Sequence, residues 1–111
     1  MEINGVKLDA DFTDADFIET LETARKKVIE DCDKVDLKNL STAEGIRQEC
    51  KIIKDFFDFV FGDGTSEKLF GNKNSLKICL DAFEDIQKES RKSISDFDER
   101  VSQYSPERLK R

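Results

Sequence analysis

The segment from Phe56 to Gly71 constrains the fold more than any other part of the chain, because a dense aromatic cluster meets a chain reversal there. Five of the nine phenylalanines and three of the five glycines lie within it. Aromatic side chains bury large areas in cores and interfaces, and glycine accepts the positive φ that tight turns require. We therefore expect a helix to end here in a cluster of rings, and the chain to fold back over it.

The helix that leads into this reversal is predicted over residues 42–61. Ser41 and Glu44 have the spacing of a capping box, in which serine and glutamate satisfy free backbone N–H groups. Apolar residues then follow at helical spacing: Ile46, Cys50, Ile53, Phe57 and Val60. The helix should stop at Gly62, because glycine accepts the left-handed conformation of a helix C-terminus.

Two further long helices are predicted on the same grounds, over residues 14–35 and 75–104. The first has the stripe Phe17, Leu21, Ala24, Val28, Cys32 and Val35. The second has the stripe Leu76, Cys79, Leu80, Phe83, Ile86, Ser90, Ile94, Phe97, Val101 and Tyr104. Beyond Ile86 this stripe thins to about one apolar residue per turn, as in a coiled-coil seam. The C-terminal half of the last helix is therefore expected to project from the body.

Residues 1–12 predict a short β-hairpin or an extended arm. Asn4-Gly5 is a strong turn signal, since both residues tolerate positive φ. The apolar residues around it are Ile3, Val6, Leu8 and Phe12. A lone hairpin is only marginally stable in water, so this segment should lean on the helices or add to a sheet edge in a partner.

Together these elements predict a mainly α fold, a small helical domain of three main helices with a short N-terminal β-hairpin or arm. We expect one domain over residues 1–111, divided into a β arm at 1–12, a helical body at 13–86, and an extended C-terminal helix and tail at 87–111. We expect five residues to join the core: Phe57, Phe61, Leu76, Leu80 and Phe83.

Composition argues against several classes of function. Charged residues make up 40% of the chain and the net charge is −6, with no basic stripe to neutralise phosphates, so we expect no nucleic-acid partner. Histidine is absent and the three cysteines contain no CxxC pair, so we expect no metal site, no cofactor and no catalytic residues. No apolar run is long enough to span a bilayer, and we expect a cytoplasmic protein.

The aromatic cluster has two interpretations, a plain core or a partly exposed interface. Phe59 is the best interface candidate because it lies off the main stripe, and Phe56 lies beside it. Together with Ile3, Val6 and Leu8 of the N-terminal arm, these residues are the predicted partner-binding set. Homo-oligomerisation could use the same surfaces.

Three stretches carry a family resemblance: FDFVFGDGT at residues 57–65, LFG at 69–71 and NSLKICLDAF at 74–83. With the opening MEINGVKL, they resemble small proteins of phages and prophages of Gram-positive bacteria, similar to the tail assembly chaperones of long-tailed phages. The resemblance implies a non-enzymatic protein of the bacterial host cytoplasm that binds tape-measure or tail-tube subunits. A structural tail component retained in the virion, and a small prophage regulator that binds a host protein, are the alternatives.

Overall fold

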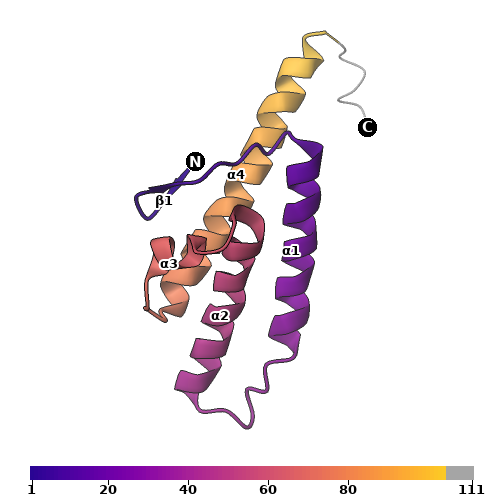
Figure 1. The fold of residues 1–111 in the computed structure, drawn as a ribbon. Helices are drawn as coiled ribbons and strands as arrows, with labels where there is room; N and C mark the ends of the chain where they lie inside the picture. The colour runs from indigo at the N-terminus through magenta and orange to yellow at the C-terminus, as the bar shows by residue number, and fades with distance from the viewer. Residues whose placement is uncertain (105–111) are drawn as a thin grey trace.

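The computed structural model describes residues 1–104, and these form a mainly α-helical domain with a short N-terminal hairpin (Figure 1). The elements are β1 (Glu2–Ile3), β2 (Val6–Lys7), α1 (Ala15–Asp33), α2 (Thr42–Phe61), α3 (Thr65–Phe70) and α4 (Leu76–Ser102). α2 contacts α1, α3 and α4, so it is the centre of the body. The predicted fold class is confirmed, with α1, α2 and α4 as the three main helices. Residues 105–111, the end of the expected C-terminal tail, lie outside the described residues.

Side-chain caps fix where the helices begin. The Ser41 hydroxyl accepts a hydrogen bond from the Glu44 N–H at 3.1 Å, and the Asp14 carboxylate accepts one from the Phe17 N–H at 2.9 Å. Each cap satisfies a backbone donor that has no partner inside its helix. α2 accordingly has the bounds that the sequence predicted, and α1 and α4 begin and end within two residues of theirs.

The chain reverses after α2 at a glycine, as predicted, but the backbone conformation of that glycine differs from the expected one. Gly62 has φ 109° and ψ 154°, a positive φ outside the left-handed helical region that we expected. The turn is then held by Asp58, whose carboxylate accepts hydrogen bonds from the Ser66 N–H at 2.8 Å and the Ser66 hydroxyl at 2.9 Å. These bonds tie the start of α3 to the last turn of α2.

The N-terminal residues form the predicted hairpin and not an extended arm. Asn4 and Gly5 both have positive φ, 50° and 79°, and Ile3 pairs with Val6 across the turn. The Asn4 side-chain amide donates a hydrogen bond to the Leu69 carbonyl at 3.1 Å. The hairpin is therefore attached to α3 and belongs to the body.

The prediction that Phe57 and Leu80 lie in the core is confirmed for Phe57 and wrong for Leu80. Phe57 is fully buried, but Leu80 is 40% exposed. Leu80 is exposed because α4 turns a different face toward the body. The buried residues of that face are Cys79, Ala82, Ile86 and Ser90. Most of these side chains are small, so the helix lies close to the body. The other three expected core residues, Phe61, Leu76 and Phe83, are partly buried and pack against the core.

The C-terminal half of α4 extends beyond the other elements (Figure 1). The molecule as a whole is elongated and measures 55 × 29 × 21 Å along its principal axes. The buried line of α4 ends at Ser90, and Ile94 and Phe97 are exposed. This confirms the projection that the narrow stripe predicted. No helix among the described residues is both long enough and apolar enough to cross a bilayer.

Candidate interaction surfaces

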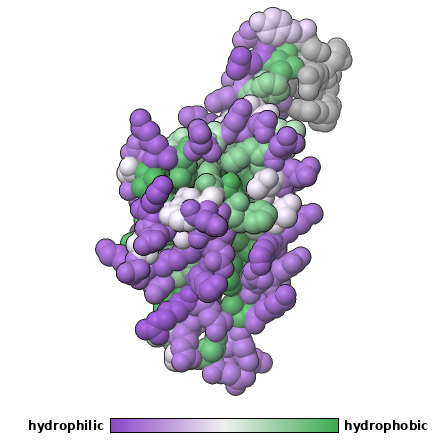
Figure 2. Space-filling view, in the orientation of Figure 1, coloured by the Kyte–Doolittle hydropathy of each residue, from purple (hydrophilic) through white to green (hydrophobic). Residues whose placement is uncertain are grey.

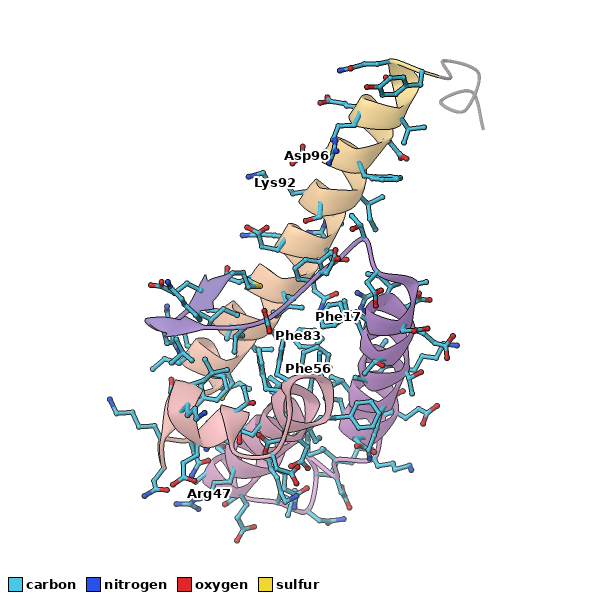
Figure 3. The ribbon with its side chains drawn as sticks, turned by 45° about the horizontal axis from the view of Figure 1, so that its top comes forward. Phe17, Arg47, Phe56, Phe83, Lys92 and Asp96 are labelled. Carbon is cyan, nitrogen blue, oxygen red and sulfur yellow. The ribbon has the colours of Figure 1, made fainter. Side chains whose placement is uncertain are left out.

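The aromatic cluster divides into buried rings and one exposed ring. Phe56 is 3% exposed and makes edge-on contacts with Phe57 and Phe83, with ring centroids 5.3 and 4.9 Å away. Figure 3 shows Phe17, Phe56 and Phe83 pointing into the space between α1, α2 and α4. Phe59 is 54% exposed. The expectation that Phe56 and Phe59 form one exposed patch is therefore wrong for Phe56, whose ring is part of the core.

Phe59 lines a small groove between α1 and α2, which we call the Phe59 groove. Its lining comes from Ala24, Lys27, Val28 and Asp31 of α1 and from Ile52, Asp55, Phe56 and Phe59 of α2. The space in it is about 20 Å³, far below the roughly 300–1,000 Å³ of small-molecule pockets. This space is about that of a single water molecule, so a partner would cover the mouth of the groove and the Phe59 ring and would not fill the groove itself.

Charged side chains border this apolar groove. Lys27 and Asp31 form an ion pair at 3.1 Å on α1, and Lys51 and Asp55 form one at 3.0 Å on α2. Exposed pairs of this kind stabilise a fold little. An apolar centre with a charged border is the usual arrangement of a protein–protein contact.

The N-terminal part of the predicted partner-binding set is largely internal. Ile3 is 3% exposed and Leu8 is 8% exposed, because both pack into the core of the body. Val6 is half-buried. The expectation that this set offers free side chains to a partner is wrong for Ile3 and Leu8, and of the three only Val6 reaches the surface substantially.

The pKa values of two cysteine thiols, Cys79 and Cys32, are raised. Burial and the neighbouring Cys50 raise the pKa of the Cys79 thiol to about 11. Burial and the nearby Glu49 also raise the pKa of the Cys32 thiol. Since the thiolate is the reactive form, both thiols remain protonated near neutral pH. Across residues 1–104, no three side chains of the ligating types come together in a way that could hold a metal ion.

This arrangement predicts the reactivity of the thiols. Cys32 is exposed, whereas Cys50 and Cys79 are buried. With a thiol reagent such as Ellman's at pH 8, we expect one of the three cysteines to react in the folded protein. All three should react after unfolding in guanidinium. Rapid reaction of two or more thiols in the folded protein would contradict the packing of α4 on α2.

The projecting half of α4 carries a surface that the partner-binding prediction missed. We call its apolar residues the α4 stripe: Ile94, Phe97 and Val101 of the helix, and Tyr104 just beyond its end at Ser102. Ile94 and Phe97 are 46% and 43% exposed, and Figure 2 shows hydrophobic surface on this end of the helix. The signal was present in the sequence as the thin continuation of the α4 pattern, but spacing alone did not show that Ile94 and Phe97 stay exposed.

Comparisons with known proteins give one match. The model of a family of unknown function (DUF6673) matches residues 4–111. Searches of the curated proteins and of the solved structures gave no match.

Proposed function

The chain belongs to this family of unknown function, and we propose that it is a non-enzymatic protein that binds other proteins during phage tail assembly. The proposed partners are tape-measure or tail-tube subunits in the cytoplasm of the bacterial host. The observation that carries the binding role is the exposed ring of Phe59 at the edge of an apolar groove. The place in tail assembly is supported by the sequence resemblance.

The surroundings of Phe59 suit a binding anchor. The ring stands on α2, one turn after Phe56, which is locked between Phe57 and Phe83. An aromatic side chain on a rigid helix loses little conformational entropy when a partner covers it. Aromatic anchors beside desolvated apolar surface are also typical of the residues that dominate binding energy. A partner that lays an apolar surface over the mouth of the groove would cover Phe59 and its neighbours together.

We expect Phe59→Asp to weaken binding to the tail proteins without unfolding the chain. The aspartate would place a charge where the partner removes water, and such a loss at a central anchor is about 2 kcal/mol or more. The measurement is co-expression with the tape-measure and tail-tube proteins of the same prophage, followed by co-purification and titration calorimetry.

Ile29→Asp is the matched control. Ile29 is 58% exposed on α1 and does not line the Phe59 groove, so this variant introduces the same charge at a site of similar exposure. It should bind as the wild type does. Equal binding by wild type and Phe59→Asp would remove Phe59 from the interface. Failure of the wild type to bind either tail protein would contradict the assembly role itself.

A further inference from the structure

We propose that Cys50 and Cys79 are a redox-active pair, which a peroxide oxidises to a disulfide bond that links α2 to α4. The proposal assigns a modification site to two thiols of the core. It uses neither the Phe59 groove nor the proposed function, so it holds or fails independently of both.

The two cysteines lie on helices that pack together. Cys50 is 0% exposed on α2 and Cys79 is 1% exposed on α4, and α2 contacts α4. Their side chains touch, since a hydrogen bond between them is one of the causes that raise the pKa of the Cys79 thiol. Both thiols are free. The two sulfurs are therefore neighbours across the contact between the helices, without a covalent bond.

Other contacts hold the two helices together near the pair. The Lys54 ammonium, one turn beyond the cysteine of α2, donates hydrogen bonds to the Lys73 carbonyl at 2.6 Å and to the Asn74 side-chain oxygen at 3.1 Å. Further along, the ring centroids of Phe56 and Phe83 are 4.9 Å apart. Along the chain these two contacts flank the cysteine of α4. The native packing therefore keeps the two thiols side by side.

A disulfide suits a close helix contact of this kind. It requires Cα atoms about 4.4–6.8 Å apart and an S–S bond of about 2.05 Å. The face that α4 turns toward the body also holds Ala82 and Ser90, whose small side chains let the helix approach closely. Formation of the bond then draws together two sulfurs that already touch.

A pocket at the N-terminal end of α4 gives a small oxidant a route to Cys79. Its space is about 320 Å³, and its lining includes Asn4 of the hairpin, Ser75, Ile78 and Cys79. Hydrogen peroxide is only slightly larger than water, whose share of liquid volume is about 30 Å³. Cys50 does not line this pocket. We therefore expect the peroxide to react first with Cys79.

The oxidation proceeds in two steps. The Cys79 thiolate attacks one peroxide oxygen, the O–O bond breaks, and a sulfenic acid forms, while the hydroxide released takes up the thiol proton and becomes water. The Cys50 sulfur then attacks the Cys79 sulfur, so the S–S bond forms, the S–O bond breaks, and a second water leaves with the Cys50 proton. In total the thiols lose two electrons and two protons, and one peroxide is reduced to two waters.

The pair is expected to react slowly. Because the pKa of Cys79 is raised to about 11, little of the reactive thiolate is present at neutral pH. The disulfide would enclose residues 51–78 in a loop, and closing a loop of this length restricts the unfolded chain and stabilises the folded one. Oxidation should therefore make the protein more stable, and reduction should reverse the effect.

Hydrogen peroxide treatment of the folded full-length chain tests the pair in a Cys32→Ser background, which removes the exposed thiol. After unfolding and blocking of free thiols with N-ethylmaleimide, peptide mapping should find one crosslink, between residues 50 and 79. The melting temperature should rise by about 10 °C or more and return to its starting value after treatment with dithiothreitol.

Cys79→Ser in the same background is the control. After peroxide treatment its Cys50 should still react with N-ethylmaleimide once the chain is unfolded, and its melting temperature should not change. Two free thiols in the Cys32→Ser protein after long treatment would overturn the proposal, as would oxidation of Cys79 to a sulfinic acid without a crosslink. A crosslink that lowers the melting temperature would show that the disulfide does not fit the native packing, and would overturn the proposal on that ground.

Two tryptophan variants test the route of the oxidant. Ile78 is 38% exposed and lines the pocket, whereas Leu80 is 40% exposed on the same helix and does not line it. Ile78→Trp should narrow the pocket and slow crosslinking several-fold, and Leu80→Trp should crosslink at the rate of the parent protein. Equal rates for the two variants would overturn this route to Cys79.

Discussion

Replacing Phe57 with alanine is expected to lower the free energy of unfolding by about 3–5 kcal/mol, the usual range for removing a buried phenylalanine ring. Phe57 is 0% exposed, and its ring contacts the rings of Phe56, Phe61 and Phe70, with centroids 5.3, 6.1 and 5.5 Å away. These neighbours come from both α2 and α3, so the cavity would open at the point where the two helices meet. Small domains have only about 5–15 kcal/mol of stability in total.

Urea unfolding followed by circular dichroism is the measurement, with two alanine variants as controls. Phe83→Ala should cost clearly less, because Phe83 is half-buried and contacts the cluster only through Phe56. Phe59→Ala should cost least, because its ring is 54% exposed. A loss below about 1 kcal/mol for Phe57→Ala would contradict the packing at the centre of the body.

Local chemistry made the helices predictable. The serine and aspartate caps need only one side chain and one backbone N–H a few residues away, so they can be recognised without knowing the fold. The same holds for Asn4-Gly5, whose tolerance of positive φ is a property of the two residues themselves. The bounds of α2 and the presence of the hairpin followed from these local signals.

The orientation of each helix was harder to predict, because neighbouring stripes differ by small rotations. Successive residues lie about 100° apart around a helix. Phe56 and Phe59 are three residues apart, so their positions around α2 differ by only about 60°, the amount by which three steps fall short of a full turn. That difference separates a buried ring from an exposed one. On α4 the large Leu80 was expected inside, but the helix turns Cys79 and Ala82 inward. Where α4 approaches the body closely, small residues fit the contact better than large ones. Which residues face the body therefore depends on the neighbouring helix and cannot be predicted from the apolar stripe of α4 alone.

The candidate surfaces could be predicted only in part, because the exposure of a side chain also depends on the neighbouring elements. Phe59 was identified because it lies off the main stripe of its own helix. The open face of the α4 stripe depends on where the body ends, which no pattern within α4 contains. The burial of Ile3 and Leu8 likewise depends on the hairpin packing on the body. The bond from Asn4 to the Leu69 carbonyl joins segments far apart in the sequence.

The hairpin is expected to contribute directly to stability, so Ile3→Ala should cost about 2–4 kcal/mol. Ile3 is 3% exposed, and a hairpin with two residues per strand cannot hold itself together without packing on another element. The truncation would remove its main apolar contact with the body. Urea unfolding of the full-length chain measures the loss.

Val6→Ala is the matched control, because Val6 is the cross-strand partner of Ile3 and is only half-buried. It changes the same hairpin with a smaller loss of buried area, so its cost should stay near 1 kcal/mol. If Ile3→Ala unfolds at the same urea concentration as the wild type, the hairpin does not pack on the body in solution. Its strand edges and apolar side chains would then be available to a partner, as the sequence first suggested. A clear loss for Ile3 and a small one for Val6 would place the hairpin in the body and leave the Phe59 groove and the α4 stripe as the candidate interaction surfaces.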